Sequence, residues 1–354
     1  MLLKDYRPRS MLVTRQNIIE RPRFPVVDAH NHLAEQFGHS WDKRPVSELL
    51  ARLDEVNVRV YVDLDGGFGE DLLNSHLDHF KAAAPDRFCI FGGVNWSAWL
   101  EHGNKFGEWA AVKLRQQAAR GAQGLKVWKP FGLSVRDQDG KLVAVDDERL
   151  IPLWETAAEL DLPITMHLAD PVAFFQPLDE HNERYDELSE HMDWHFPSPP
   201  YPSHQSIMEG LARLVARHPT TTFISAHIAS NVENLAWVGE LLDRCPNFNV
   251  DMSAQLGGLG RQPYSARRFF LKYADRILFG LDWGPNLEVY RLHFRVLETD
   301  DEYFNYSPEE IPSEGRWYVY GLYLPDEVLA KVYHQNAERL ILKKKSLPNE
   351  AAAK

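Results

Sequence analysis

Two histidines separated by a single residue are the first residues of this chain that could do chemistry. They end the stretch FPVVDAHNH (residues 24–32), in which an apolar run typical of a buried strand leads into His30 and His32. Alternate side chains of a strand share a face, so Asp28, His30 and His32 are predicted to point the same way. Two neutral imidazoles on one face can bind zinc or another divalent first-row metal. A pair of surface histidines on a loop is an equally good interpretation until other ligands are found.

Three other apolar runs also end in residues that can bind a metal. His167 follows LPITM, His227 follows TTFISA, and Asp282 follows RILFGL. The apolar runs alone define these strands, so the ligand-type residues at their ends are a separate observation. If the ends of the strands meet, the sequence predicts a metal site there.

The elements that must position these residues form a repeating pattern, in which each apolar run is followed by a stretch with helical spacing. The predicted strands are residues 24–32, 58–64, 87–94, 122–128, 162–167, 221–227, 247–252 and 276–281. The predicted helices are residues 46–57, 71–84, 106–120, 147–160, 206–218, 232–245, 264–274 and 325–341. This α/β pattern predicts a (β/α)8 TIM barrel, whose active site lies at the carboxyl ends of the strands. An open doubly wound sheet is disfavoured because no glycine-rich phosphate loop follows the first strand.

One barrel domain with additions is the predicted organisation. Residues 1–23 form an arginine-rich N-terminal arm that lies across a surface or a partner subunit, residues 24–345 form the barrel, and residues 346–354 form a tail. The insertion after the fifth strand, residues 168–204, is far longer than the usual loop of about 2–6 residues. Residues 170–205 are expected to cover the barrel mouth as a lid, and a surface excursion whose aromatic residues pack on neighbouring helices is the alternative. A second insertion follows the eighth strand and contains RLHFRVLETDDEYFNY, interpreted as an interface or a pocket rim.

Composition excludes several classes of function. The 39 basic and 51 acidic residues give a net charge of −12, which argues against nucleic acid as a partner. No window of about 18 apolar residues predicts a membrane span. The charged opening MLLKDYRPRSML does not resemble a signal peptide, although a longer precursor stays open. The two cysteines, Cys89 and Cys245, are interpreted as buried thiols of a cytoplasmic protein. A small-molecule substrate is expected, and a homo-oligomer stays open.

The motifs DAHNH, ITMH, SAH and FGLDW, in this order, resemble those of the amidohydrolase superfamily of metal-dependent barrel enzymes. The most similar branch is the amidohydrolase 2 group, which includes aminocarboxymuconate-semialdehyde decarboxylase and the resorcylate decarboxylases. The resemblance covers residues 24–342 and includes the closing stretch VYHQNAERLI. It implies that His30, His32, His167 and Asp282 bind the metal. It also implies that His227 lies beside the metal as an acid/base or a ligand, for which a core histidine is the structural alternative.

Lys126 leaves the number of metals open. Its strand GLKVW resembles GxxKV-type strands of the phosphotriesterase-like branch, where a carboxylated lysine bridges two metals. Otherwise Lys126 is expected to orient the substrate or to pair with a carboxylate, since a buried lysine needs a partner.

Three more residues are candidates for binding the substrate. Arg261, in the glycine-rich stretch after the seventh strand, could bind a substrate carboxylate, although an ion pair with a surface acid explains a lone arginine equally well. Trp128 and Trp283 could form apolar pocket walls or plain core. His76 and His79, on an outer helix, are expected to be solvated.

These residues favour an enzyme over a non-catalytic binding protein, because every expected ligand position holds a competent residue. The first expectation is a hydrolase that attacks a C–N or C–O bond of a small cyclic or carboxylated molecule with a metal-activated water. In it, Asp282 takes a proton from that water, and His227 either holds the developing oxyanion or protonates the leaving group. The alternative is a non-oxidative decarboxylase that uses the same ligands. Zinc is the preferred ion, and manganese also fits three histidines and an aspartate.

Overall fold

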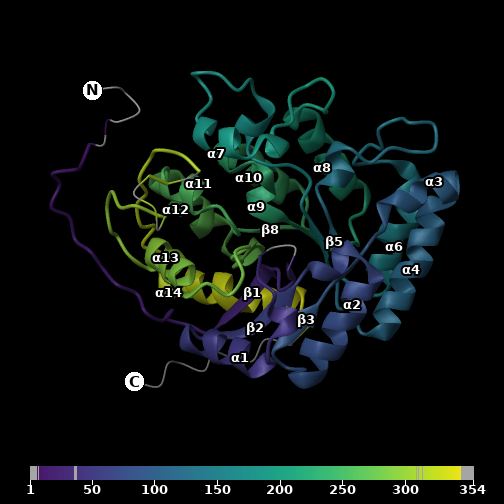
Figure 1. The fold of residues 1–354 in the computed structure, drawn as a ribbon, viewed down its shortest axis with the longest axis horizontal. Coiled ribbons are helices and arrows are strands. Elements are labelled where there is room, and N and C mark those ends of the chain that lie inside the picture. The colour runs from purple at the N-terminus through teal and green to yellow at the C-terminus, as the bar shows by residue number, and fades with distance from the viewer. Residues whose placement is uncertain are drawn as a thin grey trace.

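The computed structural model describes residues 6, 8–35, 38–307, 309, 311–312 and 314–343. The predicted tail, residues 346–354, and residues 1–5 and 7 of the predicted arm lie outside this range. The described part of the arm runs along one edge of the molecule without a helix or a strand (Figure 1). Its anchors are hydrogen bonds from the backbone N of Asn17 to Asp301 (2.7 Å) and from the backbone N of Arg23 to Glu298 (3.0 Å). The division into arm, barrel and tail stays a prediction.

Short parallel strands occupy the middle of the fold, and helices surround them (Figure 1). Within the described residues, one sheet has the order β1-β2-β3 and the other runs from β4 to β9 in chain order. The strands are β1 Val26–Asn31, β2 Val58–Asp63, β3 Phe88–Ile90, β4 Gly92–Gly93, β5 Leu125–Val127, β6 Ile164–Met166, β7 Phe223–Ser225, β8 Phe248–Asp251 and β9 Ile277–Leu278. Every predicted strand is present, and β3 and β4 together replace the third one.

Backbone hydrogen bonds join the two sheets at both edges. Phe91, between β3 and β4, donates its N–H to Asp63 O of β2 at 2.9 Å. At the other edge, Ala29 N donates to Phe279 O and Asp282 N donates to His30 O, both at 2.9 Å. The first and the last strand are therefore neighbours, which confirms the predicted α/β barrel and brings His30 beside Asp282.

The predicted helices are present with small shifts of their ends. They are α1 Val46–Glu55, α2 Glu70–His76 with a π-helical continuation over Leu77–Lys81, α4 Phe106–Arg120, α6 Ile151–Glu159, α8 His204–Arg217, α10 Leu235–Arg244, α12 Pro263–Lys272, and α14 Asp326–Ala330 joined to α15 Asn336–Leu340 by the π-helical Lys331–Gln335. Local sequence sets the ends. The Ser203 side chain caps α8 by accepting from Ser206 N, and α4 ends at Gly121, whose φ of 124° suits glycine.

Further helices lie in the loops: α3 Trp99–His102, α5 Pro130–Leu133, α7 Tyr185–Glu190, α9 Ala226–Ser230, α11 Leu256–Gly260 and α13 Leu287–Glu298. The longest, α13, includes part of the second insertion. Its residues Tyr290, Phe294 and Leu297 follow helical spacing and are buried against the barrel. The interpretation of this segment as a rim or an interface was therefore incomplete, because its first half is a packed helix.

Two buried polar residues make contacts that the sequence did not predict, and for His76 the expectation was wrong. The pairing of β1 with β2 is irregular between Asp28 and Asn31. Asp28 accepts hydrogen bonds from the Tyr290 hydroxyl of α13 and from Leu281 N at 3.1 Å. His76 is fully buried rather than solvated, with its Nδ1 2.7 Å from Asp63.

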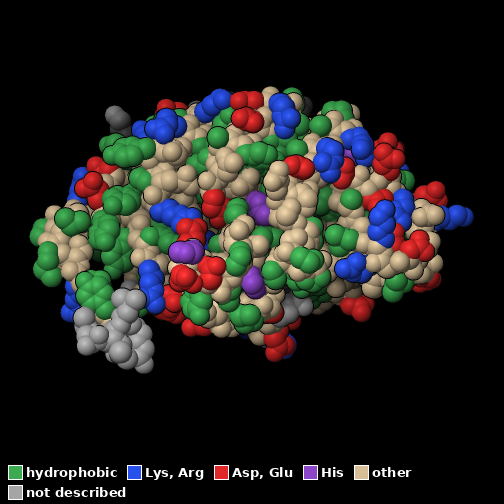
Figure 2. All heavy atoms as spheres, turned by 90° about the horizontal axis from the view of Figure 1, so that it is seen from above, with side chains coloured by type: hydrophobic (Ala, Val, Ile, Leu, Met, Phe, Trp, Pro, Cys, Tyr) green, Lys and Arg blue, Asp and Glu red, His purple; other side chains and the backbone are tan. Residues whose placement is uncertain are grey.

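The surface mixes charges. In the face shown by Figure 2, basic and acidic side chains are interspersed, and histidines lie near the middle of that face. Both cysteines are buried and free, as predicted. Among the described helices, none has the length and apolar character needed to cross a membrane.

Candidate metal centre

Three imidazoles converge on one carboxylate at the carboxyl ends of the strands. The Nε2 atom of His32 lies 3.2 Å from Asp282 Oδ1, and that of His30 lies 3.6 Å from the same oxygen. The Nε2 atom of His227 lies 3.6 Å from Asp282 Oδ2. The last strand thus places one aspartate opposite histidines from β1 and from the turn after β7.

A separate acceptor fixes the opposite nitrogen of each ring. His30 Nδ1 lies 2.9 Å from Asp251, His32 Nδ1 lies 2.6 Å from Asp65, and His227 Nδ1 lies 2.9 Å from the carbonyl oxygen of Ser253. Carboxylates and carbonyls only accept, so each neutral ring carries its proton on Nδ1. In the neutral ring the lone pair is therefore on Nε2, the nitrogen on the side of Asp282, and it can bind a metal.

Burial and charge set the ionisation of this cluster. Burial, with the nearby Lys126 charge, lowers the pKa of His30 to about 4. Burial also opposes a charge on His32, but hydrogen bonds with Asp282 and Asp65 raise its pKa to about 8. Burial disfavours the carboxylate of Asp282, yet the charge of His30 and the hydrogen bond of His32 hold its pKa well below the usual range. The cluster therefore combines a neutral His30 ring, a His32 ring that keeps its second proton up to about pH 8, and an ionised Asp282 carboxylate.

The donor set fits a divalent cation. Ligand atoms of His30, His32 and Asp282 lie within 4.8 Å of one another, and so do those of His30, His227 and Asp251. The Nε2 atom of His227 is buried without a hydrogen-bond partner, a state that costs free energy unless another group satisfies it. A third cluster, Asp63, Asp65 and His76, lies behind His32.

Lys126 lies inside the barrel, at the place that its strand predicts. It is fully buried, and its Nζ is 3.1 Å from His30 Nε2 and 4.6 Å from the ring centre of Trp128. Burial lowers its pKa to about 8, while Asp282 and Asp251 favour its charge. A lysine so placed can hold an anionic oxygen beside the three rings.

His167 is adjacent to this cluster, but its ring makes a hydrogen bond outside it. Its ring centre is 4.4 Å from that of His227, whereas its Nε2 lies 3.2 Å from Asp170. Asp170 in turn accepts from Lys129 Nζ at 2.7 Å. Burial and the neighbouring His227 lower the pKa of His167 to about 3, so the ring is neutral. His167 is near enough to join the cluster, but its Nε2 already has a partner.

The three predicted substrate residues lie in different surroundings. The ring of Trp128 is 5.1 Å from that of His32, and it lines a cavity of about 950 Å³ with Phe68 and Trp96. Trp283, which is 54% exposed, lines a separate cavity of about 500 Å³. Arg261 instead makes two 2.8 Å hydrogen bonds to Glu183, so the ion-pair alternative describes its contacts.

Sequence reasoning missed the residues that orient the ligands: Asp65, Asp170, Asp251 and Ser253. One signal was available, because Asp251 also ends a predicted strand and Asp65 directly follows one. Asking which strand ends carry carboxylates would have found both. Their pairing with particular histidines depends on three-dimensional contacts that spacing does not give.

Comparison with known proteins places this geometry in a wider context. The sequence model of the amidohydrolase family matches residues 27–341. Among solved structures, a putative amidohydrolase from Staphylococcus aureus has a TM-score of 0.56 at 18% identity, covering 90% of this chain and 99% of that chain. A dihydroxybenzoic acid decarboxylase from Polaromonas sp. JS666, with bound manganese and 2-nitroresorcinol, has a TM-score of 0.55 at 17% identity, covering 91% and 98%.

A third solved structure, 2,6-dihydroxybenzoate decarboxylase complexed with 2,6-dihydroxybenzoate, has a TM-score of 0.55 at 17% identity, covering 90% of this chain and 99% of that chain. Identities this low show a shared fold. No curated protein matches the chain.

Proposed function

We propose, from the premise that this chain belongs to the amidohydrolase family, that it is a metal-dependent, non-oxidative decarboxylase of a small aromatic acid. The observation that carries the proposal is the buried Lys126 ammonium, 3.1 Å from His30 Nε2 inside a cluster of histidines and Asp282. A cation beside a set of metal ligands suits a substrate that is itself an anion.

The metal would be held by His30, His32, His167 and Asp282. To take part, His167 Nε2 would have to give up its Asp170 partner, and His30 Nε2 would have to give up its contact with Lys126 Nζ. The Nε2 atoms of His30 and His32 both face Asp282. A bound divalent ion would supply positive charge that polarises the oxygens of the substrate. Zinc and manganese both fit such ligands, and the manganese in the Polaromonas decarboxylase structure favours manganese.

The remaining residues can bind the substrate and move a proton. Lys126 Nζ would hold a carboxylate or phenolate oxygen, and the indole of Trp128 would cover the aromatic ring. His227 would take up a second proton from solvent at Nε2 and deliver it to the ring carbon that bears the carboxylate, which returns the imidazole to its neutral form. The C–C bond to the carboxylate then breaks, its electrons return to the ring, and CO2 leaves. One proton is consumed for each CO2 released.

Hydrolysis, the first expectation from the sequence, takes second place in this proposal. Two of the similar solved structures are decarboxylases of dihydroxybenzoates, and a hydroxybenzoate fits the combination of Lys126, Trp128 and the His/Asp cluster. Carboxylation of Lys126, with a second metal, stays a prediction. The free, buried Cys89 and Cys245 support the cytoplasm as the location.

Incubation with a panel of acids tests the proposal. Protein loaded with Mn²⁺ or Zn²⁺ is mixed with mono- and dihydroxybenzoates and, separately, with lactones and amides. We expect CO2 and an equal amount of the corresponding phenol from at least one hydroxybenzoate. Hydrolysis of a lactone or amide, without CO2 from any acid, would reject the decarboxylase in favour of the hydrolase.

A further inference from the structure

The turn that carries His227 has an unusual backbone. Four consecutive residues other than glycine adopt left-handed conformations: His227 (φ 59°), Ile228 (φ 52°), Ala229 (φ 58°) and Ser230 (φ 50°). Such conformations bring Cβ close to the following carbonyl oxygen, so single residues adopt them rarely and runs are rarer still. Strained backbone of this kind persists only where surrounding contacts hold it, and it is concentrated at functional sites.

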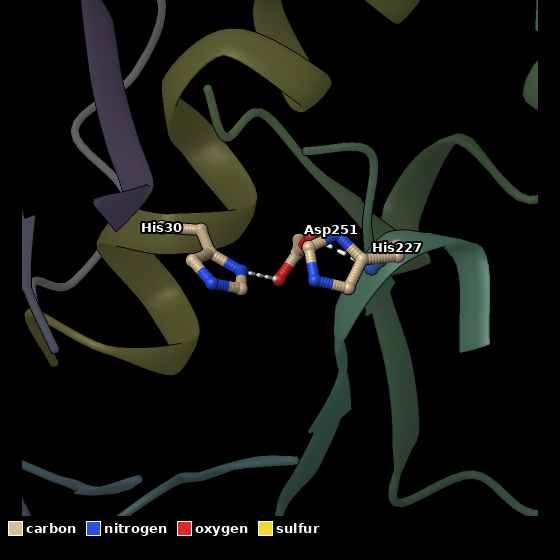
Figure 3. A group of neighbouring side chains, drawn as sticks. All are labelled: His30, His227 and Asp251. Atoms are coloured by element: carbon tan, nitrogen blue, oxygen red, sulfur yellow. Dashed lines mark hydrogen bonds and ion pairs between the residues drawn. The ribbon is translucent and has the colours of Figure 1, made fainter. Parts of the chain in front are cut away.

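One carboxylate lies where it can hold this turn. Asp251, at the end of β8, is fully buried and accepts from the backbone N–H of His227 at 3.1 Å. The same oxygen, Oδ1, accepts from Ser253 N at 3.1 Å and from the Ser253 hydroxyl at 2.5 Å. The other oxygen, Oδ2, accepts from His30 Nδ1 at 2.9 Å. Figure 3 shows Asp251 between the two histidines.

Ser253 strengthens this link. Its hydroxyl oxygen lies 3.0 Å from His30 Nδ1 and 3.1 Å from His227 Nδ1, and its carbonyl oxygen is the main acceptor for the second ring. The contacts of Asp251 and Ser253 therefore reach both rings and the backbone of the left-handed turn. Among the described residues, no other carboxylate accepts hydrogen bonds from both His30 and His227.

We propose that Asp251 is a positioning residue that orients His30 as a metal ligand and His227 as the proton carrier through a single carboxylate. The roles of the two histidines rest on the proposed function, but their shared positioning does not. It follows that a change at Asp251 disturbs both rings together, although neither ring is hydrogen-bonded to the other.

Asp65 provides a matched control. It is likewise fully buried, and its Oδ1 lies 2.6 Å from His32 Nδ1, while its Oδ2 accepts from the backbone N–H groups of Leu33 and Ala34. Asp65 thus orients one ligand ring and its own loop, and it has no recorded contact with the turn after β7. Asp65→Asn and Asp251→Asn make the same chemical change. The first is predicted to affect only His32, and the second both His30 and His227.

The test uses ¹⁵N-histidine NMR of the metal-free full chain, together with Mn²⁺ titration. In Asp251→Asn, we expect the Nδ1–H form of His30 to be lost, the His227 signals to shift, and Mn²⁺ affinity to fall by about 10–100-fold. In Asp65→Asn, we expect a similar loss of affinity and a change at His32, with His227 unchanged. Neither readout requires turnover, so both remain valid if no substrate releases CO2.

Three outcomes would overturn the proposal. One is an Asp251→Asn protein that keeps Mn²⁺ affinity within twofold and an unmoved His227 signal. Another is a His227 shift of equal size in both variants. The third is a second equivalent of metal that disappears only in Asp251→Asn, because Asp251 would then be a ligand. If Asp251→Asn does not fold, Ser253→Ala still decides: a shift at both rings supports the proposal, and no shift at either contradicts it.

Discussion

The two sides of the candidate metal centre differ in the contacts that their histidine rings make. On the β1 side, His30 and His32 have their Nδ1 atoms fixed by Asp251 and Asp65, and their Nε2 atoms face Asp282. On the β6 side, the Nε2 atom of His167 is bonded to Asp170, which is paired with Lys129.

On the β1 side, a divalent cation would be held by His30, His32 and Asp282, and His30 Nε2 would have to release Lys126 Nζ. His167 could join only after its bond to Asp170 is broken or shared. The β1 side would then supply most of the metal ligands, and the β6 side would add the last one. Substitutions on the two sides should therefore lower metal affinity by different amounts.

The largest effect is expected from His32→Asn. The change removes one of the prepared lone pairs and leaves the buried Asp65 without its ring partner. We expect metal binding to fall below detection by elemental analysis and turnover to fall to background. His181→Asn, at an exposed histidine, is the control and should bind metal normally. A His32→Asn protein that retains one equivalent of metal would contradict the leading role of the β1 side.

His227→Asn should lower kcat by about 10²–10⁴-fold, the usual range for a lost acid/base group, while one metal stays bound. Stopped-time CO2 assays and elemental analysis on the same sample measure both quantities. Near-normal turnover would make His227 a core histidine. Loss of the metal would instead make it a ligand, as its 3.6 Å distance from Asp282 allows.

His167→Asn and Asp170→Asn separate the β6 side into its two parts. His167→Asn should weaken or abolish metal binding, since it removes the imidazole of a predicted ligand. Asp170→Asn should leave metal affinity equal or higher, because it weakens the group that competes with the metal for His167 Nε2. Calorimetric titration of Mn²⁺ into each variant compares them. A lower Mn²⁺ affinity in Asp170→Asn than in His167→Asn would mean that Asp170, rather than His167, is the metal ligand.

A pH effect is expected above the β6 side, at Glu187. Burial raises the pKa of Glu187 to about 7, above its ordinary value of 4.5. The folded protein therefore binds this proton more tightly than the unfolded chain, so the contribution to stability is complete below about pH 4.5 and is lost as the pH rises through 7. Glu187→Gln should reduce the fall in Tm between pH 5 and pH 8, whereas Glu190→Gln, at an exposed acid, should not. Equal falls in both variants would show that Glu187 does not titrate in this range.

The smallest effect is expected from Arg261→Met. Because Glu183 already occupies the guanidinium group of Arg261, the variant should lose no more than about 1 kcal/mol of stability and should keep the KM of the wild type. Glu183→Gln is the matched partner and should behave alike. A large rise in KM in Arg261→Met alone would restore the substrate-binding role predicted from the sequence.

Much of the barrel could be predicted because its information is local. Apolar runs of β-type residues, separated by stretches of helical spacing, marked every strand, and His30, His32, His227 and Asp282 met because parallel strands end on one side. The wrong expectation concerned a residue whose surroundings depend on non-local packing. His76 is buried because Asp63, far from it in the sequence, offers it a partner behind the site.

The contacts of the carboxylates that orient the histidine rings could not be predicted from the sequence either. Asp251 and Asp65 are common residues at ordinary strand ends, and nothing in their spacing selects His30 or His32 as a partner. The left-handed turn at His227 was also beyond prediction, since no glycine marks it. Sequence patterns therefore predicted the candidate ligands, whereas the contacts that orient their rings required the structure.

CO2 release measured against added metal tests the central claim most directly. Metal-free protein is titrated with Mn²⁺ in the presence of a hydroxybenzoate identified by the substrate panel. We predict a linear rise in rate that levels off at about one equivalent per chain, or at two if Lys126 is carboxylated. Full CO2 release by the metal-free chain, unchanged by any added metal, would contradict the account.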